Sequence, residues 1–472
     1  MVFPIAGGTQ DTSYEIENSL RFEDGDSPEL TFTPSSAGTQ TKFTISLWFK
    51  LGNITSTRRV LFGAGDDYLR LADDDNIQWH VTDNGGTGRS FYAPAKIRDP
   101  SAWYHVVALW DTTQGTDTNR MRLWKNGVEQ TANSFTRPSQ NATSQTLNSA
   151  AAHKLGGELN PANDFHFDGY ISEFYFIDGY AYDYQDFGKF NENGVWIPKD
   201  FTGSYGSNGI RLEFKQTGTS ANSSGMGADT SGNDNHMSVT NLAATDVTTD
   251  TPTNNFMIMN PLFTNSRGTF AEGNLKVTTD VQGSVPYGQV EFGSFAVNKG
   301  KWYYEAKINS VGSGGQLAIG WNERAEDGNY INGHNNLGSN GNAWYGSGGN
   351  IKIGSASTQT GPSSYTDDDI IGVAIDLDND KIHFHKNGSY QRSSDPANNT
   401  GGDSLSSSYN NYWTPWMSKD DTNHEATVEY NFGNPTFTVS SSEADDNGYG
   451  SFEYDVPTGY YSLCTKNLAE FG

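Results

Sequence analysis

Catalysis would show itself in this sequence as a pair of carboxylates. Glycoside hydrolysis needs two such groups flanking the scissile bond, often on one strand face at alternating positions. Glu453 and Asp455 begin that pattern, but Pro457 follows where the strand and a second glutamate would have to continue. Glu15 and Glu17 also alternate, without a second acidic partner, which indicates solvated charges. The sequence therefore predicts a protein that is not an enzyme.

A second acidic group suits a hard cation. Aspartates bracket the segment YLRLA on both sides, so that two adjacent loops could present oxygen ligands to Ca²⁺. They are Asp66, Asp67, Asp73, Asp74 and Asp75, of which the first four are the candidate ligands. Acidic turns are also expected in a chain with 56 acidic and 30 basic residues, so both interpretations stay open. Apart from this possible Ca²⁺, the sequence predicts no cofactor.

The histidines and the single cysteine do not form a metal site. None of the nine histidines occurs as His-x-x-x-His or beside the cysteine. His383 and His385 alternate along one strand, which is typical of an exposed sheet face. Cys464 is the only cysteine, which excludes an intrachain disulfide and favours a buried thiol.

Two loops have the composition of a binding surface. Aromatic faces flanked by amide and hydroxyl groups bind sugars and planar polar ligands. The candidate ligand-binding residues are Asn342, Trp344 and Tyr345 in one loop, and Tyr409, Asn411, Tyr412 and Trp413 in the other. The alternative is that Trp344 and Trp413 fill the core of their own domain, because buried aromatic residues outnumber exposed ones.

These residues must be positioned by β-structure. Aromatic residues make up 13% of the chain, glycine occurs 53 times, and β-branched and aromatic runs are joined by turn residues. One pattern occurs twice: two apolar strands with an acidic loop between them, followed by Lys-Asn-Gly. Asn126–Gly127 and Asn387–Gly388 predict type I′ turns, in which both residues have positive φ. We expect an all-β chain of two antiparallel β-sandwiches in tandem.

The domain organisation follows from composition. We expect an N-terminal docking arm over residues 1–18, with Phe3 and Ile5 lying along a neighbouring subunit. A first sandwich is predicted over residues 19–215, a polar connector over 216–262 and a second sandwich over 263–472. The connector is inferred because its first forty residues are rich in Gly, Ser, Thr, Asn and Asp.

Charge and hydropathy limit the partners. A formal charge of −26 would repel a phosphate backbone, so nucleic acid is not expected as a partner. The sequence contains no signal peptide and no apolar run of about 18 residues, so we expect a protein that is soluble where it is made and is not inserted into a membrane.

Several segments resemble known families. FTISLWFKL (43–51), AWYHVVALWD (102–111), LWKNG (123–127) and FDGYISEFYFIDG (167–179) resemble the laminin G-like branch of the concanavalin A-like sandwiches. GKWYYEAKI (300–308), AIGW (318–321), IGVAIDLDNDKIHFHKNG (371–388) and PTGYYSL (457–463) resemble a SPRY domain. The two together, with DTPTNNFMIMNPL (250–262), look like virion structural proteins of tailed, especially marine, bacteriophages.

The resemblance implies a virion surface protein made in the host cytoplasm. It implies other virion proteins as partners, a homo-oligomer, and a host surface glycan or protein as ligand. Our main hypothesis is a tail-fibre or receptor-binding component. The alternatives are a capsid-decorating head appendage and a glycan depolymerase, the latter disfavoured by the missing carboxylate pair. Laminin G-like folds often hold calcium at the sandwich rim, which supports a Ca²⁺ site at the four aspartates.

Overall fold

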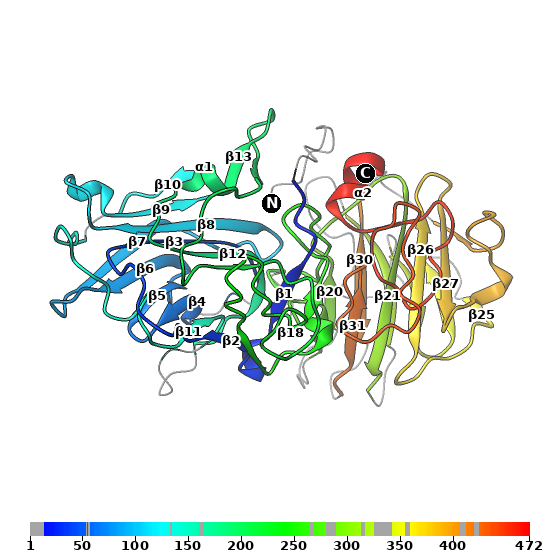
Figure 1. Ribbon diagram of the computed structural model, residues 1–472. Helices are drawn as coiled ribbons and strands as arrows, with labels where there is room; N and C mark the ends of the chain where they lie inside the picture. Colours follow the sequence, from blue (N-terminus) through cyan, green and yellow to red (C-terminus); the bar gives the residue numbers. More distant parts are fainter. Residues whose placement is uncertain are drawn as a thin grey trace. The chain divides into compact units, whose positions relative to one another are not determined.

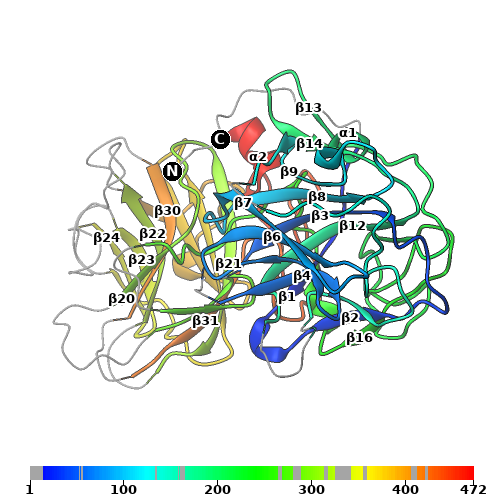
Figure 2. The same ribbon diagram turned by 90° about the vertical axis from the view of Figure 1, so that its left-hand side faces the viewer.

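The computed structural model consists of two compact units, which meet in sequence between Thr253 and Asn254. It describes residues 14–52, 54, 57–132, 135–157, 159, 165–263, 268–279, 289–312, 317–324, 342–354, 359–405, 412–419 and 424–472. The all-β prediction is confirmed, because the described part of the chain folds into sheets that are antiparallel except for one parallel strand pair, with short helical turns (Figures 1 and 2). Within that part, no helix has the length and apolar character needed to span a membrane.

The first unit contains two large sheets. The eight-stranded sheet has the order β10 (Val128–Glu129), β9 (Met121–Lys125), β8 (Trp103–Asp111), β3 (Lys42–Leu51), β12 (Gly169–Asp178), β1 (Ser19–Phe22) and β17 (Val247–Thr248), with β15 (Ile210–Leu212) paired to β12. The seven-stranded sheet has the order β16 (Ser238–Thr240), β2 (Glu29–Phe32), β11 (His153–Leu155), β4 (Arg59–Ala64), β5 (Asp67–Leu71), β6 (Asn76–Thr82) and β7 (Gly88–Lys96).

Short elements complete this unit. They are η1 (Asp24–Asp26), η2 (Asp117–Asn119), η3 (Ala244–Asp246), α1 (Tyr184–Phe187) and the two-stranded sheet of β13 (Gly188–Phe190) and β14 (Trp196–Pro198). The helix α1 begins with a capping box, in which Asp183 and Asp186 satisfy backbone N–H groups at the first turn.

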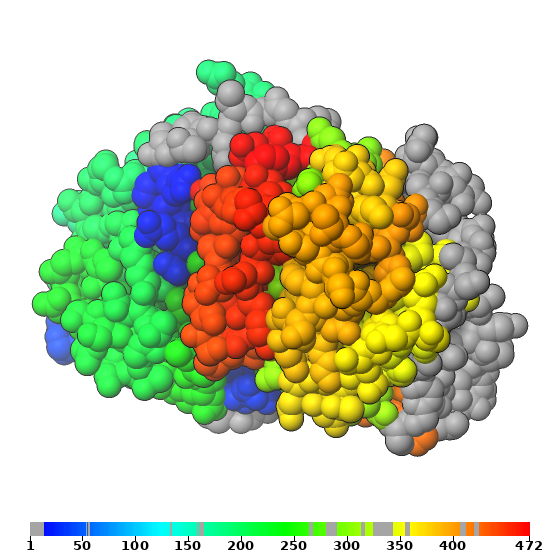
Figure 3. Space-filling model, turned by 90° about the vertical axis from the view of Figure 1, so that its right-hand side faces the viewer, coloured from blue at the N-terminus to red at the C-terminus, as the bar shows by residue number. Residues whose placement is uncertain are grey.

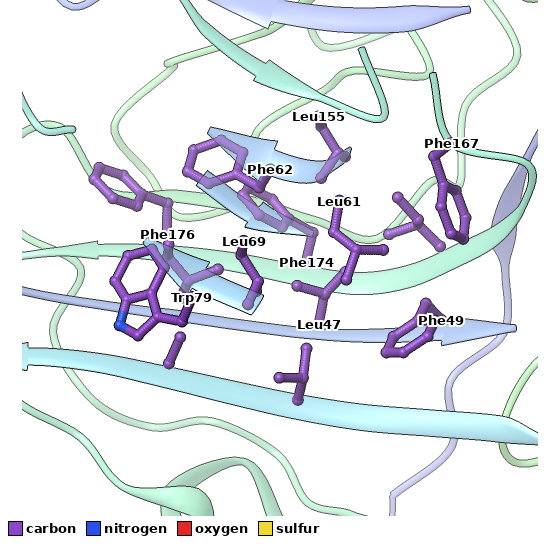
Figure 4. Packing of buried hydrophobic residues seen from close by; sticks show 14 of the residues in the cluster. Leu47, Phe49, Leu61, Phe62, Leu69, Trp79, Leu155, Phe167, Phe174 and Phe176 are labelled. Carbon is purple, nitrogen blue, oxygen red and sulfur yellow. The ribbon is translucent and has the colours of Figure 1, made fainter. Parts of the chain in front are cut away.

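The core of the first unit lies between its two sheets (Figure 4). Leu47 and Phe49 of β3 contribute to the same buried cluster as Leu61 and Phe62 of β4 and Trp79 of β6. Strand β12 changes the parity of its inward residues at a bulge between Ser172 and Tyr175. The extra residue at the bulge shifts the inward-pointing positions from odd to even residue numbers. Ile171 before the bulge and Phe174 and Phe176 after it therefore all point into the core.

Residues 216–253 belong to the first unit, so the predicted boundaries are corrected here. Strand β16 pairs with β2 and β17 pairs with β1, at one edge of each sheet. Met226, Met237 and Leu242 are buried in the first core. Residues 254–262 begin the second unit, because Met257, Ile258 and Met259 are buried in the second core. The segment was predicted to be a connector because it is mostly polar, but its few apolar residues are buried in the two cores.

The second unit also contains two large sheets. The nine-stranded sheet has the order β18 (Thr269–Ala271), β19 (Lys276–Thr278), β31 (Thr427–Asn431), β21 (Lys301–Ser310), β26 (Ile370–Asp376), β27 (Lys381–Lys386) and β28 (Ser389–Tyr390), with β29 (Asp403–Ser404) on β27 and β32 (Tyr461–Ser462) on β21. The six-stranded sheet has the order β20 (Gln289–Phe292), β30 (Tyr412–Lys419), β22 (Leu317–Arg324), β23 (Asn342–Gly346), β24 (Asn350–Ile353) and β25 (Gln359–Thr360). The remaining elements are η4 (Gln391–Ser393) and α2 (Thr465–Phe471).

One face of the nine-stranded sheet is covered by the chain after β31, which forms the orange-red band in Figure 3. Phe452 and Tyr460 of this segment pack with Tyr303 and Ala374 of the sheet. His383 and His385 do share a strand face, but both are buried rather than exposed. Glu305 of β21 accepts hydrogen bonds there from the backbone N–H groups of Glu453 and Tyr454, both at 2.9 Å.

The local turn predictions are confirmed. Asn126 and Gly127 have φ of 47° and 73°, and Asn387 and Gly388 have φ of 49° and 77°. Successive positive φ values are those of a type I′ turn, which suits the twist of an antiparallel hairpin. Cys464 is a buried free thiol, as predicted, and burial raises its pKa to about 11.

Candidate functional site

Three neighbouring strands of the first unit carry a grid of polar and aromatic side chains. Leu69 of β5, Trp79 of β6 and Phe91 of β7 belong to the core, so the alternate residues of these strands lie on the opposite sheet face. Strand pairing aligns those residues in two rows. The β5–β7 platform comprises Tyr68, His80 and Ser90 in one row, and Arg70, Gln78 and Tyr92 in the other.

The second row is ordered by a chain of hydrogen bonds. Arg70 Nε donates to Gln78 Oε1 at 2.8 Å, and Gln78 Nε2 donates to the Tyr92 hydroxyl oxygen at 2.7 Å. A guanidinium can only donate, which fixes the orientation of the Gln78 amide. Since the Tyr92 oxygen accepts from Gln78, its own O–H remains available to donate outward. Tyr92 is 46% exposed, so a ligand can reach both ring and hydroxyl.

The first row is stacked. The Tyr68 and His80 rings are 4.9 Å apart at 17°, and Arg70 Cζ lies 4.0 Å from the centroid of Tyr68. His80 Nδ1 lies 2.5 Å from Ser90 Oγ. Burial is the main cause that lowers the pKa of His80, so its ring is neutral at pH 7. The platform is therefore a preordered surface of planar groups, with one guanidinium and no carboxylate among its six side chains.

The four aspartates predicted to bind Ca²⁺ are not brought together. Asp66 precedes β5 and Asp67 begins it, whereas Asp73 and Asp74 follow it, and five strand residues span about 17 Å. Asp67 is buried and accepts from Ser144 Oγ at 2.6 Å and from the N–H of Thr82 at 2.5 Å. Asp73 and Asp74 each form an ion pair, Asp73 with Arg58 at 2.9 Å and Asp74 with Lys96 at 3.5 Å. These residues do not fit one shared cation.

Another acidic trio lies elsewhere in the described part of the first unit. Ligand oxygens of Glu23, Asp24 and Asp168 lie within 4.8 Å of one another. The Arg59 guanidinium lies near enough to interact electrostatically with Asp24 and Asp168, although burial is the largest influence on the pKa of Arg59 and lowers it. This cation supplies positive charge to the trio from within the protein.

The predicted aromatic loops lie largely inside the second unit. Trp344 and Trp413 are 4% and 3% exposed, and Tyr345 is fully buried. Trp413 and Tyr345 belong to the main core, and Trp344 packs with Trp416 against the other face of the six-stranded sheet. Tyr412 is exposed. Asn342 begins β23, and Tyr409 and Asn411 lie outside the described residues. A ligand could stack on Trp344 or Trp413 only if these rings were exposed, and both are buried.

The predicted docking arm is described only in its last residues. Phe3 and Ile5 lie outside the described residues. Ile16 packs with Trp48, Trp103 and Tyr170 on the first unit. Residues 14–18 are thus part of the sandwich.

Sequence reasoning missed the platform. The run DYLRL and the run NIQWHVT do alternate between apolar and polar or aromatic side chains, which was the available signal. Alternation predicts a strand with two different faces, but the alignment of Tyr68 with His80 and of Gln78 with Tyr92 is a property of strand pairing.

Two family descriptions match the chain. The concanavalin A-like lectin/glucanases superfamily matches residues 24–180, and the SPRY domain matches residues 301–396. The chain therefore contains a concanavalin A-like domain followed by a SPRY domain. No curated protein matches the chain.

Some solved structures are similar to parts of this chain. The SPRY domain of human HERC1 is 19% identical over 33% of this chain and 87% of its own, with a TM-score of 0.26. A proposed carbohydrate-binding protein from Bacteroides ovatus is 14% identical over 48% of this chain and 58% of its own, with a TM-score of 0.34. A heptameric pentraxin from Limulus polyphemus is 14% identical over 35% of this chain and 77% of its own, with a TM-score of 0.25.

Proposed function

We propose that this protein is a non-enzymatic glycan-binding protein and that the β5–β7 platform is its binding surface. The observation that carries the proposal is the ordered grid of planar groups, with Tyr92 exposed at its edge. A sugar ring packs its apolar face on an aromatic ring while its hydroxyls bond to polar groups, and Tyr92 offers both a ring and a hydroxyl, whereas the Gln78 amide is 2% exposed and is hydrogen-bonded to Arg70 and Tyr92. The concanavalin A-like match supports it, since that superfamily includes lectins.

Binding is favoured over cleavage by the chemistry of the platform. Glycoside hydrolysis requires two carboxylates about 5–10 Å apart, and none of the six platform residues is acidic. The nearest acidic residue in sequence, Asp67, has its carboxylate occupied by Ser144, Thr82 and the backbone of Thr146. The proposed activity needs no cofactor.

The binding experiment compares two exposed tyrosines of the first unit. Tyr92→Ala removes the platform ring, whereas Tyr180→Ala removes a ring of similar exposure, 44%, outside the platform. On an array of bacterial surface polysaccharides and oligosaccharides, we expect wild type and Tyr180→Ala to bind the same glycans. Tyr92→Ala should bind them about tenfold more weakly, or about 1.4 kcal/mol. Equal binding by all three proteins would reject the platform as the site.

We further propose that the protein lies on the surface of a tailed-bacteriophage virion, where it assembles with copies of itself and with other virion proteins. There it would attach the particle to a host surface glycan. The resemblance of its two domains and their junction to such virion proteins supports this context. Labelling purified particles with an antibody against the chain distinguishes a tail-fibre position from a capsid-decorating one. Release of sugar from host polysaccharide by the purified protein would instead favour a depolymerase.

A further inference from the structure

Arg70 differs from the other buried arginines of the described chain. Four arginines are buried: Arg21, Arg59, Arg70 and Arg89. Arg21 pairs with Asp246 at 3.1 Å, Arg59 with Asp75 at 3.1 Å and Arg89 with Asp83 at 2.5 Å. Among the described residues, no carboxylate forms an ion pair with Arg70. A buried cation is normally paired, because desolvating an unpaired charge is costly.

The surroundings of Arg70 leave its terminal nitrogens available. Its Nε is bonded to Gln78 and its guanidinium plane lies against Tyr68. The side chain is 8% exposed, and no hydrogen bond from Nη1 or Nη2 is made to the described residues. Stacking and the Gln78 bond thus fix the guanidinium while two of its nitrogens keep their donors, which is the geometry that binds a carboxylate or sulfate in two places.

A second cation, Arg58, lies near Arg70, and Asp73 pairs with Arg58 at 2.9 Å. Arg58 Cζ lies 5.5 Å from the ring centroid of Phe165, and Arg70 Cζ lies 6.0 Å from the same ring. Arg58 lowers the pKa of Arg70 by repulsion, although burial is the larger cause. Among the described residues, the positive charge left here without an ion pair is therefore that of Arg70, in a chain of net charge −26. A buried guanidinium without an ion pair, close to the exposed ring of Tyr92, indicates that the platform binds an anionic ligand.

We infer that the β5–β7 platform binds an acidic sugar, whose carboxylate or sulfate group contacts the Nη atoms of Arg70 and the hydroxyl of Tyr92 while its ring packs on Tyr92. This inference rests on the proposed function and specifies its ligand class. The platform spans three strands, or about 10 Å at 4.8 Å per spacing, which accommodates one or two pyranose rings. Arg70 selects for the charge, and Tyr92 contributes affinity for neutral and acidic sugars alike through its ring.

The test uses the full chain and three matched hexasaccharides. The first is a hexauronate, the second is its carboxyl-reduced neutral form, and the third is that neutral form carrying sulfate esters. Titration calorimetry in 50 mM NaCl should show at least tenfold tighter binding of one acidic hexasaccharide than of the neutral one. The stronger acidic ligand identifies carboxylate or sulfate as the natural group. Raising NaCl to 500 mM should weaken acidic binding several-fold and leave neutral binding unchanged.

The variants assign the selectivity to Arg70. Arg70→Gln should reduce the acidic preference to less than twofold, and Arg70→Lys should keep part of it. Arg122→Gln is the matched control, because Arg122 also stacks on an aromatic ring, 4.4 Å from Trp124, but is paired with Glu129 at 2.7 Å. It should behave as wild type. If Arg70→Gln is unfolded by circular dichroism, Tyr92→Phe takes its place and should weaken acidic binding several-fold more than neutral binding.

The outcomes separate the two proposals. Equal affinity for acidic and neutral hexasaccharides, with loss of both in Tyr92→Ala, would overturn the acidic specificity and keep the glycan-binding function. An acidic preference that survives Arg70→Gln, or Tyr92→Phe where that replaces it, would also overturn the inference. Absence of binding to all three hexasaccharides, together with unaltered array binding by Tyr92→Ala, would reject both.

Discussion

At the scale of single residues, Glu305 shows how a buried carboxylate fastens a covering segment. Its oxygens accept from Tyr303 Oη at 3.0 Å and Asn431 Nδ2 at 3.2 Å, besides the N–H groups of Glu453 and Tyr454. These four bonds favour the charged form, but burial outweighs them and raises the pKa of Glu305 to about 7. The Glu305 carboxyl group therefore connects β21 to the chain after β31 by hydrogen bonds, and it changes its protonation state near neutral pH.

This pKa predicts a pH-dependent contribution to stability. An unfolded glutamate loses its proton near pH 4.3, whereas folded Glu305 holds it to about 7. Between these values the folded state binds more protons, so the free energy of unfolding falls as pH rises, by about 4 kcal/mol in total. Glu305→Gln should remove this slope. Urea unfolding of both proteins from pH 4 to 8 measures it as a pH-dependent difference between them.

The control is Glu470→Gln, because Glu470 is exposed on α2. It should reproduce the wild-type pH profile. A constant difference between wild type and Glu305→Gln across this pH range would contradict the assignment of the titration to Glu305.

At the scale of elements, the segment 216–253 is held to the first unit by a buried ion pair. Lys50 Nζ of β3 lies 2.8 Å from Asp250 Oδ2, both side chains are fully buried, and Trp103 Nε1 donates to Asp250 Oδ1 at 3.1 Å. Burial is the largest influence on the pKa of Lys50 and lowers it, whereas Asp250 raises it. Asp250 thus stabilises the charged lysine inside the sandwich.

Asp250→Ala should destabilise the first unit by about 3–5 kcal/mol, because it removes the carboxylate that compensates a buried ammonium. Asp234→Ala, at an exposed aspartate of the same segment that lies 3.9 Å from His236, should change the free energy of unfolding by less than about 0.5 kcal/mol. Urea unfolding followed by tryptophan fluorescence measures both. Equal, small effects would show that Asp250 does not anchor the segment.

The contrast between predicted and missed features also belongs to this scale. Asn126–Gly127 and Asn387–Gly388 were predictable because two successive positive φ values are a local requirement of the backbone. The platform was not, because Arg70 meets Gln78 and Tyr92 only through the pairing of three strands. For the aromatic segments, composition left two interpretations open, and the burial of Trp344 and Trp413 in packed clusters agrees with the one that placed these rings in the core of their own domain.

At the scale of the whole molecule, each unit has its own core and its own pair of large sheets. We therefore predict that residues 10–253 fold when expressed alone, whereas residues 19–215 do not. The shorter fragment lacks β16 and β17, the buried Met226 and Met237, and Asp250. Near-ultraviolet circular dichroism should show fixed aromatic packing in the longer fragment and its loss in the shorter one. Identical spectra and melting temperatures would refute this boundary.

The pairing of β1 with β17 has one more consequence. Ser19 lies opposite Thr248, and Thr253 Oγ1 donates to the carbonyl of Ile16 at 2.8 Å, so the chain leaves the first unit beside the place where it enters. A module with adjacent ends can be inserted into a surface loop of an unrelated host protein, or rejoined by a short linker and reopened elsewhere as a circular permutant, without disturbing either sheet.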